Sequence, residues 1–193
     1  YLPIPLKNKF CTLSKQDELD IQNRVVSLIH GTVLGVLAGY AFYFTPGQCG
    51  DVNTQYEKNM IYIAVGYFIY DFLCMAYYGL LDMTMILHHS ATAIGMTFAL
   101  IIGQSGNIVV GGMFIAEVSN PPMHFRVMLK HLGLRYSKAY ETSEITFIML
   151  YCFGRILLGC YQVWSVCSCG PAHIMMKVVA CVLLLQSLHF IKQ

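Results

Sequence analysis

Two adjacent histidines, His88 and His89, are the residues in this sequence whose side chains and spacing best suit catalytic chemistry. Imidazole titrates near neutral pH, so either side chain could act as a general base or a nucleophile. Neighbouring helix residues point about 100° apart, so the two rings are not expected to bind one metal ion. We expect one ring to face an interior space and the other to pack against a neighbouring helix. Two structural histidines, bonded to Ser90, Thr84 or tyrosine hydroxyls, are the alternative.

The chain around these histidines is strongly apolar, with 56% hydrophobic and 11% charged residues among 193. A soluble domain carries about 25% charged residues, so few charges would be left here to cover a soluble exterior. The composition predicts a polytopic α-helical integral membrane protein: a polar N-terminal segment, 1–24, and a six-helix transmembrane bundle, 25–193. A spanning helix needs about 20 mainly apolar residues. The six stretches that meet or approach this are 25–44, 60–81, 83–102, 108–125, 145–166 and 172–191.

Further ionisable side chains fall inside these stretches: His30, Asp71, Glu117 and Arg155. Each costs about 2.5–3.5 kcal/mol at bilayer depth, so we expect them to share a shielded interior. Asp71 lies on a helix stripe with tyrosines, and the stripe is either a hydrogen-bonded seam or a cavity wall. Pro121 and the next proline must kink or end the fourth helix near Glu117. Arg155 needs a counter-charge from Glu117 or Asp71, in a pair that either holds helices in register or does chemistry.

If six helices span the membrane, successive loops lie on alternate sides of it, and the Lys and Arg residues then fall mostly on one side. One side holds nearly all of them and the other side only Lys58, which places both ends of the chain on the cytoplasmic, or matrix, side of an intracellular membrane. The formal charge of +2 and the lack of a basic run argue against nucleic acid as a partner. The residues on the basic side are Lys7, Lys9, Lys15, Arg24, Arg126, Lys130, Arg135, Lys138 and Lys192.

Three of the eight cysteines lie in loops on the side opposite the basic residues. Cys49 could pair there with Cys167 or Cys169, or all three could be free thiols. Cys167-x-Cys169 lacks the second ligand pair that a zinc site needs, so no metal site is predicted. Nothing in the sequence indicates haem, flavin or nucleotide binding, and no cofactor is expected.

The same positions carry a family resemblance. The chain resembles the TLC-domain family, which includes the ceramide synthases and the TRAM proteins, and within it the small TLC domain-containing proteins most. The resemblance implies a six-helix bundle that encloses a lipid-accessible cavity. The matching segments are 23–31, 66–71, 85–89 and 116–126, together with Arg155.

In the ceramide synthases the histidine pair belongs to the acyl-transfer site, and the resemblance places His88 and His89 there. Those enzymes carry a His-Asp…Asp signature on the next helix, where this chain keeps a single acid, Glu117. We therefore expect a protein that binds or handles a phospholipid, sphingolipid or acyl chain in membrane-lipid homeostasis, rather than a true ceramide synthase. Asp71, His88, His89, Glu117 and Arg155 would surround the polar head of the lipid.

Two alternatives stay open. The first is a non-catalytic accessory subunit of a large membrane-protein complex, in which the bundle would serve as a scaffold. The second is a lipid acyltransferase in which His88 or His89 is the base or nucleophile and Glu117 supports the proton step. The sequence leaves open whether the protein is an enzyme.

Overall fold

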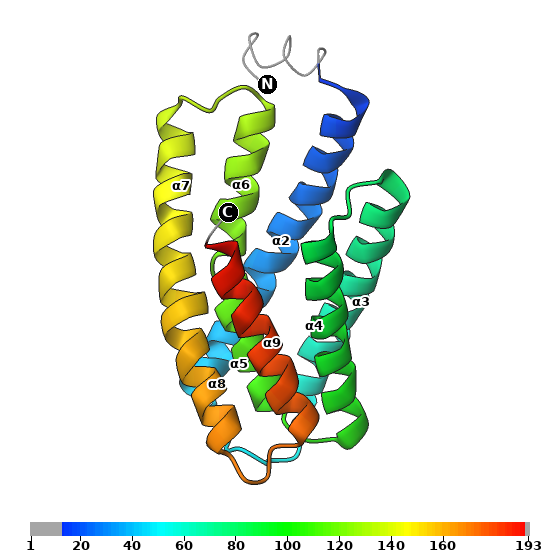
Figure 1. The fold of residues 1–193 in the computed structure, drawn as a ribbon, viewed down its shortest axis with the longest axis vertical. Helices are drawn as coiled ribbons and strands as arrows, with labels where there is room; N and C mark the ends of the chain where they lie inside the picture. The colour runs from blue at the N-terminus through cyan, green and yellow to red at the C-terminus, as the bar shows by residue number, and fades with distance from the viewer. Residues whose placement is uncertain (1–12, 192–193) are drawn as a thin grey trace.

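The computed structural model describes residues 13–191, which form a bundle of helices joined by short turns (Figure 1). The predicted all-α, six-helix bundle is confirmed, although two of its six rods are interrupted. The helices are α2 (Lys15–Phe44), α3 (Gln55–Tyr78), α4 (Met83–Ile102), α5 (Gly106–Glu117), α6 (Asn120–His131), α7 (Lys138–Tyr151), the π-helical segment η1 (Cys152–Leu158), α8 (Gly159–Ser168) and α9 (Ile174–Phe190).

Short polar residues at the helix starts explain where several rods begin. The side chain of Ser14 accepts a hydrogen bond from the amide of Asp17, and Thr54 and Glu57 form a reciprocal capping box at α3. Asp82 accepts the amide of Met85 at 2.8 Å at the start of α4. These caps satisfy amides that have no partner within the helix.

The first helix is longer than its predicted span, because α2 begins at Lys15 rather than at residue 25. Part of the predicted N-terminal segment 1–24 is therefore helical, while residues 1–12 lie outside the described part of the chain. Hydropathy marks only the portion of a helix that suits lipid, whereas a capped polar turn can extend it into water. The predicted basic residues Lys7, Lys9 and Lys192 also lie outside the described residues.

The fourth predicted span, 108–125, is two helices. α5 ends at Glu117, and α6 starts at Asn120 and continues to His131, beyond the predicted end. The stretch between the fourth and fifth predicted spans is therefore mostly helical, and only the short turn between α6 and α7 remains outside the helices. Within residues 13–191, four helical rods are long and apolar enough to cross a membrane: α2, α3, α4 and the continuous rod 138–168, while α9 is apolar but shorter.

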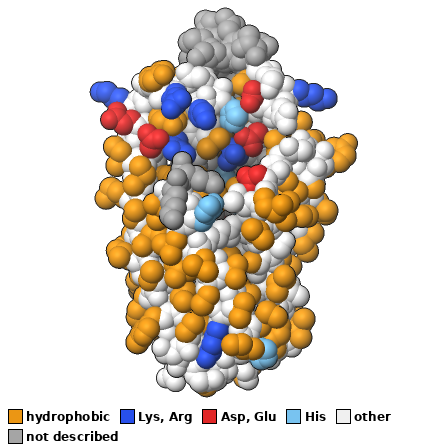
Figure 2. Space-filling view, viewed as in Figure 1, with side chains coloured by type: hydrophobic (Ala, Val, Ile, Leu, Met, Phe, Trp, Pro, Cys, Tyr) orange, Lys and Arg blue, Asp and Glu red, His pale blue; other side chains and the backbone are white. Residues whose placement is uncertain are grey.

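The outside of the bundle is apolar along most of its length. Tyr77 is 85% exposed, Ile101 is 76% exposed and Phe44 is 73% exposed. Figure 2 shows hydrophobic side chains over the body of this face, with charged groups gathered toward one end. Such an exterior suits lipid and supports the reading of the chain as an integral membrane protein.

α2 packs closely against α5. Gly31, Gly35 and Gly39 recur at every fourth position of α2, and a Cβ atom at Gly39 would lie 3.0 Å from the Phe114 ring. Small residues at this spacing let two membrane helices approach closely. The buried apolar cluster beside this contact joins α2, α3, α4 and α5 and includes Leu34, Ala38, Met60, Ile61, Ala64, Met96 and Val110.

A disulfide links Cys49, between α2 and α3, to Cys169, between α8 and α9. The structure thus selects one of the two predicted pairings and leaves Cys167 as a free thiol. The bond lies at the end of the bundle away from the start of α2 and the turn between α6 and α7 (Figure 1). At the same end, the side chain of Asn53 donates to the Ala99 carbonyl and accepts from the Gly106 amide, each at 2.7 Å.

Candidate functional site

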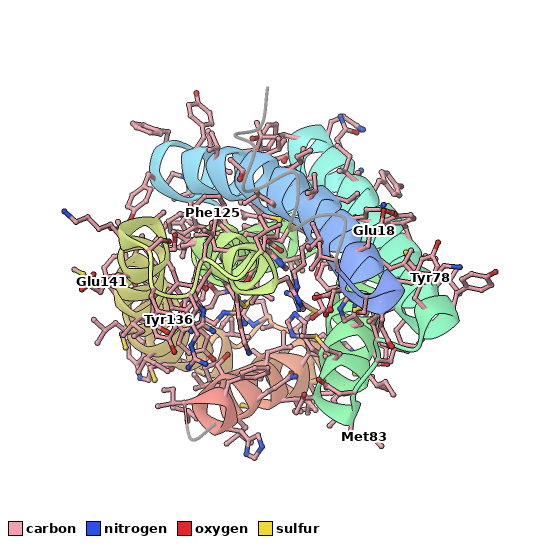
Figure 3. The ribbon with its side chains drawn as sticks, turned by 90° about the horizontal axis from the view of Figure 1, so that it is seen from above. Glu18, Tyr78, Met83, Phe125, Tyr136 and Glu141 are labelled. Atoms are coloured by element: carbon pink, nitrogen blue, oxygen red, sulfur yellow. A yellow bond between two sulfur atoms is a disulfide. The ribbon has the colours of Figure 1, made fainter. Side chains whose placement is uncertain are left out.

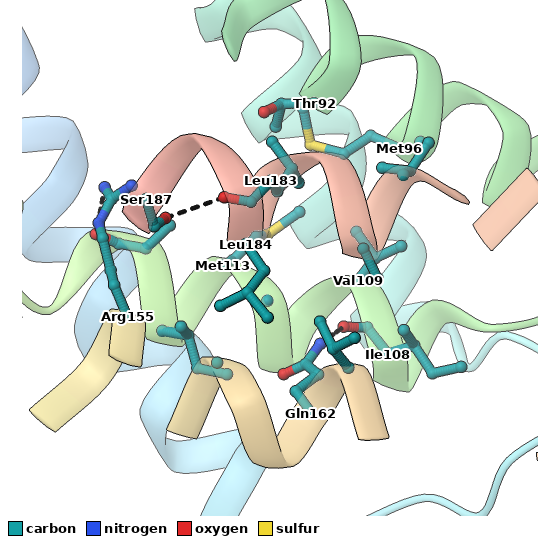
Figure 4. Close-up of a pocket in the computed structure, with 18 of the residues that line it drawn as sticks. Thr92, Met96, Ile108, Val109, Met113, Arg155, Gln162, Leu183, Leu184 and Ser187 are labelled. Carbon is teal, nitrogen blue, oxygen red and sulfur yellow. Dashed lines mark hydrogen bonds between the residues drawn. The ribbon is translucent and has the colours of Figure 1, made fainter. Parts of the chain in front are cut away.

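A cavity of about 140 Å³ lies between α4, α5, α8 and α9, with Phe68 of α3 on one wall. Viewed down the bundle, the helices surround a centre into which side chains project (Figure 3). Most of the lining is aliphatic or thioether, including Met96, Val109, Met113, Leu183 and Leu184 (Figure 4). The polar lining residues are His88, Thr92, Glu117, Arg155, Gln162 and Ser187.

Arg155 is held by the break between α5 and α6. Its Nη2 atom donates to the Ala116 carbonyl and to Oδ1 of Asn120, each at 3.0 Å, and its Nε atom donates to Oγ of Ser119 at 3.4 Å. The guanidinium carbon also lies 5.4 Å from the centre of the Tyr151 ring. Arg155 comes from the π-helical segment η1, and such local widening of a helix is frequent at functional sites.

Close approach of two backbones makes this geometry possible. A Cβ atom at Gly154 would lie 2.8 Å from Cγ1 of Val118 and 3.0 Å from the Ile115 carbonyl oxygen. Pro121 and Pro122 provide no backbone N–H, so the carbonyls four residues before them, those of Glu117 and Val118, lack their usual helical donors, and α5 ends there. The guanidinium of Arg155 therefore lies against a helix end, where it donates to the neighbouring Ala116 carbonyl.

Glu117 is buried beside this arginine, but the two side chains do not form the direct ion pair expected from the sequence. Among the described residues, no carboxylate lies within 4.0 Å of the Arg155 guanidinium nitrogens. The Asn120 amide bridges them, because its Nδ2 atom donates to Oε2 of Glu117 at 2.9 Å while its oxygen accepts from Arg155. An amide can serve both charges at once because it has a donor end and an acceptor end.

Asp71 forms a second buried cluster with different partners from those predicted. Its Oδ1 atom accepts from Nδ2 of Asn23 at 2.9 Å, and its Oδ2 atom lies 3.4 Å from Nε2 of His89. The expected seam of tyrosines bonded to Asp71 is thus wrong in its partners. Tyr67 instead stacks on His30, with ring centres 3.5 Å apart.

The histidine pair divides as its spacing predicts. His88 lines the cavity, while His89 turns toward Asp71 and is buried. The two rings are perpendicular, with centres 5.7 Å apart. Of the five residues predicted to surround a lipid head, His88, Glu117 and Arg155 border the cavity, whereas Asp71 and His89 form a cluster outside its lining.

Sequence reasoning missed several polar residues that complete the site. Asn23 and Asn120 supply the amides that satisfy the buried carboxylates, and Gln162 donates to the Ile108 carbonyl at 2.7 Å. Each is an uncharged polar side chain in or beside an apolar stretch, which was the available signal. Within residues 13–191, no cluster of three His, Cys, Asp or Glu side chains is placed to hold a metal ion.

The fold and cavity together define a polytopic α-helical membrane protein with polar groups at an interior apolar space. The family model of the TLC domain matches residues 20–192, and the chain belongs to the TLC domain family, as its resemblance predicts. It is similar to TLC domain-containing protein 1 of Gallus gallus, with 26% identity over 150 residues. That alignment covers 74% of this chain and 58% of the chicken protein, so the match spans little more than half of the relative's length.

Proposed function

We propose that this protein binds a membrane lipid by admitting its acyl chain into the cavity between α4, α5, α8 and α9, as part of membrane-lipid homeostasis. The observation that carries the proposal is an apolar interior space bordered by His88, Glu117 and Arg155. Ligand sites in proteins combine such apolar walls with a few placed polar groups. The polar groups would receive the carbonyl end of the chain while the aliphatic walls contact its methylenes.

The size of the cavity favours an acyl chain over a whole lipid headgroup. A cavity of about 150 Å³ in another protein accommodates benzene, so the roughly equal space here fits about six carbons. A glycerophospholipid with its headgroup needs several times this volume. The rest of the lipid would therefore leave the bundle between helices and remain in the bilayer.

Acyl transfer is the second candidate, because the imidazole of His88 borders the same cavity as Glu117. The histidine that contacts a carboxylate is His89, however, and it lies outside the lining. His89, the one of the two adjacent histidines that a carboxylate could activate as a base, therefore does not reach the cavity. This favours lipid binding over catalysis. Appearance of a labelled acyl group on His88 after incubation with an acyl donor would reverse this ranking.

A cavity-filling variant tests lipid binding. A Cβ atom at Gly112, which lines the cavity, would contact only Nε2 of Gln162, at 3.4 Å, so a side chain can start there and Gly112→Leu adds bulk to the cavity wall. Gly66→Leu is the matched control, because a Cβ atom there meets nothing within 4 Å. Displacing two methylenes costs about 1.6 kcal/mol, or more than tenfold in affinity.

The measurement is native mass spectrometry of each purified variant with its co-purified lipid. We expect the wild type and Gly66→Leu to retain lipid, and Gly112→Leu to retain at least about tenfold less. Equal retention by the two variants would contradict the proposed site. A wild-type protein without lipid would contradict the function and would favour the accessory-subunit alternative.

A further inference from the structure

Two free cysteines face each other between α8 and α9. The Sγ atoms of Cys167, in the last turn of α8, and Cys181, in α9, are 3.9 Å apart. Cys167 is exposed and Cys181 is half-buried. Cys167 precedes the disulfide-bonded Cys169 by a single intervening residue, whereas Cys181 lies near the middle of α9.

We propose that Cys167 and Cys181 form a second, reversible disulfide that joins α8 to α9. The two sulfur atoms need to approach by about 1.9 Å to reach the bonding distance of about 2.05 Å. Cys167 can make this movement, because α8 ends at Ser168 and its side chain is not packed. Oxidised Cys169 beside it indicates that disulfide oxidants reach this end of the protein.

The difference in exposure sets the order of the two exchange steps. The Cys167 thiolate attacks a sulfur of a disulfide oxidant, such as oxidised glutathione or a protein disulfide carrier, and expels one thiolate. The Cys181 thiolate then attacks the Cys167 sulfur of the mixed disulfide and expels the second thiolate. The cysteine pair loses two protons and two electrons, and the oxidant becomes two thiols.

A lysine contact joins the end of α8 to the first turn of α9. Nζ of Lys177 donates a hydrogen bond to the Cys167 carbonyl at 3.1 Å. This bond holds the residue that carries the exposed thiol next to α9, where Cys181 lies. Cys160, which is also exposed on α8, has no such contact among the described residues.

The bond would fix one wall of the cavity. Val163 lies one helical turn before Cys167, Ala180 directly precedes Cys181, and both line the cavity. The oxidised form would hold these two wall positions together, whereas in the reduced form α8 and α9 are held by the turn between them, by their packing and by the Lys177 contact.

The test is a redox titration of the purified full chain in glutathione buffers, followed by alkylation, proteolysis without reduction and mass spectrometry. We expect a peptide containing Cys181 to become linked to the α8 peptide as oxidised glutathione increases, and to be released as reduced glutathione increases. Cys167→Ser should abolish this link. Cys160→Ser, which changes another exposed α8 cysteine on the same tryptic peptide, should retain it.

Every outcome of the titration decides the proposal. Alkylation of Cys181 at all glutathione ratios would overturn it, as would persistence of the link in Cys167→Ser. A link that survives a large excess of reduced glutathione would overturn its reversible character. Fragment ions that join Cys181 to Cys169 would show that the first disulfide has rearranged instead.

Discussion

Replacing Gly154 with alanine should destabilise the junction that holds Arg155. The new Cβ atom would lie 3.0 Å from the carbonyl oxygen of Ile115, which is backbone and cannot rotate away, and 2.8 Å from Cγ1 of Val118. Relief requires η1 to move away from α5, which lengthens the bond from Arg155 to the Ala116 carbonyl. Gly159→Ala is the matched control on the same rod, because its nearest contact would be an ordinary 3.6 Å to Cδ1 of Leu184.

Both substitutions gain the helix preference of alanine over glycine, so this gain cancels when the two variants are compared. Alanine is favoured over glycine within a helix by about 1 kcal/mol at either position. Overpacking a filled interior costs about 1–3 kcal/mol, and only Gly154→Ala incurs it. The free energies of unfolding of the two variants should therefore differ by about 1–3 kcal/mol. A difference of that size corresponds to roughly 2–12 °C in the melting temperature of a domain this large.

Thermal unfolding of both variants in the same lipid nanodiscs, followed by circular dichroism, measures this difference. Gly159→Ala should melt above the wild-type temperature, and Gly154→Ala should melt at or below it, because its overpacking cost equals or exceeds its helix-forming gain. Equal melting temperatures would show that the close approach of η1 to α5 does not constrain the protein. The contact between η1 and α5 would then not be what positions Arg155.

Three further changes probe the other features that hold the bundle together. Cys49→Ser should cost about 2–5 kcal/mol, because it opens a long covalent loop. In a Cys167→Ser background, the reductant that lowers the melting temperature of the chain with Cys49 should leave the Cys49→Ser chain unaffected. Asn120→Ala should cost about 3 kcal/mol or more in denaturant unfolding, because it removes two charge-assisted bonds, whereas Gly66→Ala, inside α3 and without a clash, should stabilise the protein by about 1 kcal/mol. The hydroxyl of Thr84, followed by two amides of α4, lowers the pKa of Asp82 below its usual 3.8. The stabilisation by this cap is therefore present above pH 3.8 and lost as the pH falls through the lower folded-state pKa, so the melting difference between wild type and Asp82→Ala should disappear in acid.

Periodicity and prolines within single segments predicted the helices of this protein well, but they did not predict the contacts between the helices. The 100° turn per helical residue was sufficient to separate His88 from His89, and the prolines after Glu117 were sufficient to predict the broken fourth helix. The partners of the buried charges were not predictable in the same way. Periodicity identifies which face of a helix is polar but not which residue of another helix lies opposite it.

The amides that satisfy the buried carboxylates show why the site could be predicted only in part. Charged residues in apolar stretches attract attention because they are costly, whereas Asn23 and Asn120 cost less and carry a weaker signal. The choice of Cys169 over Cys167 by Cys49 likewise depends on how two loops meet in space. Neither outcome follows from composition or spacing within a single segment.

The bond between Cys49 and Cys169, which are 120 positions apart, turns most of this chain into a macrocycle. α3 through α8 lie within this closed circuit, whereas α2 precedes it at Cys49 and α9 follows it at Cys169. A protease that cuts any one turn inside the circuit would linearise it without releasing a fragment. While Cys167 and Cys181 are reduced, α9 is attached to the circuit through its first residues alone and is the cavity wall with the fewest covalent constraints.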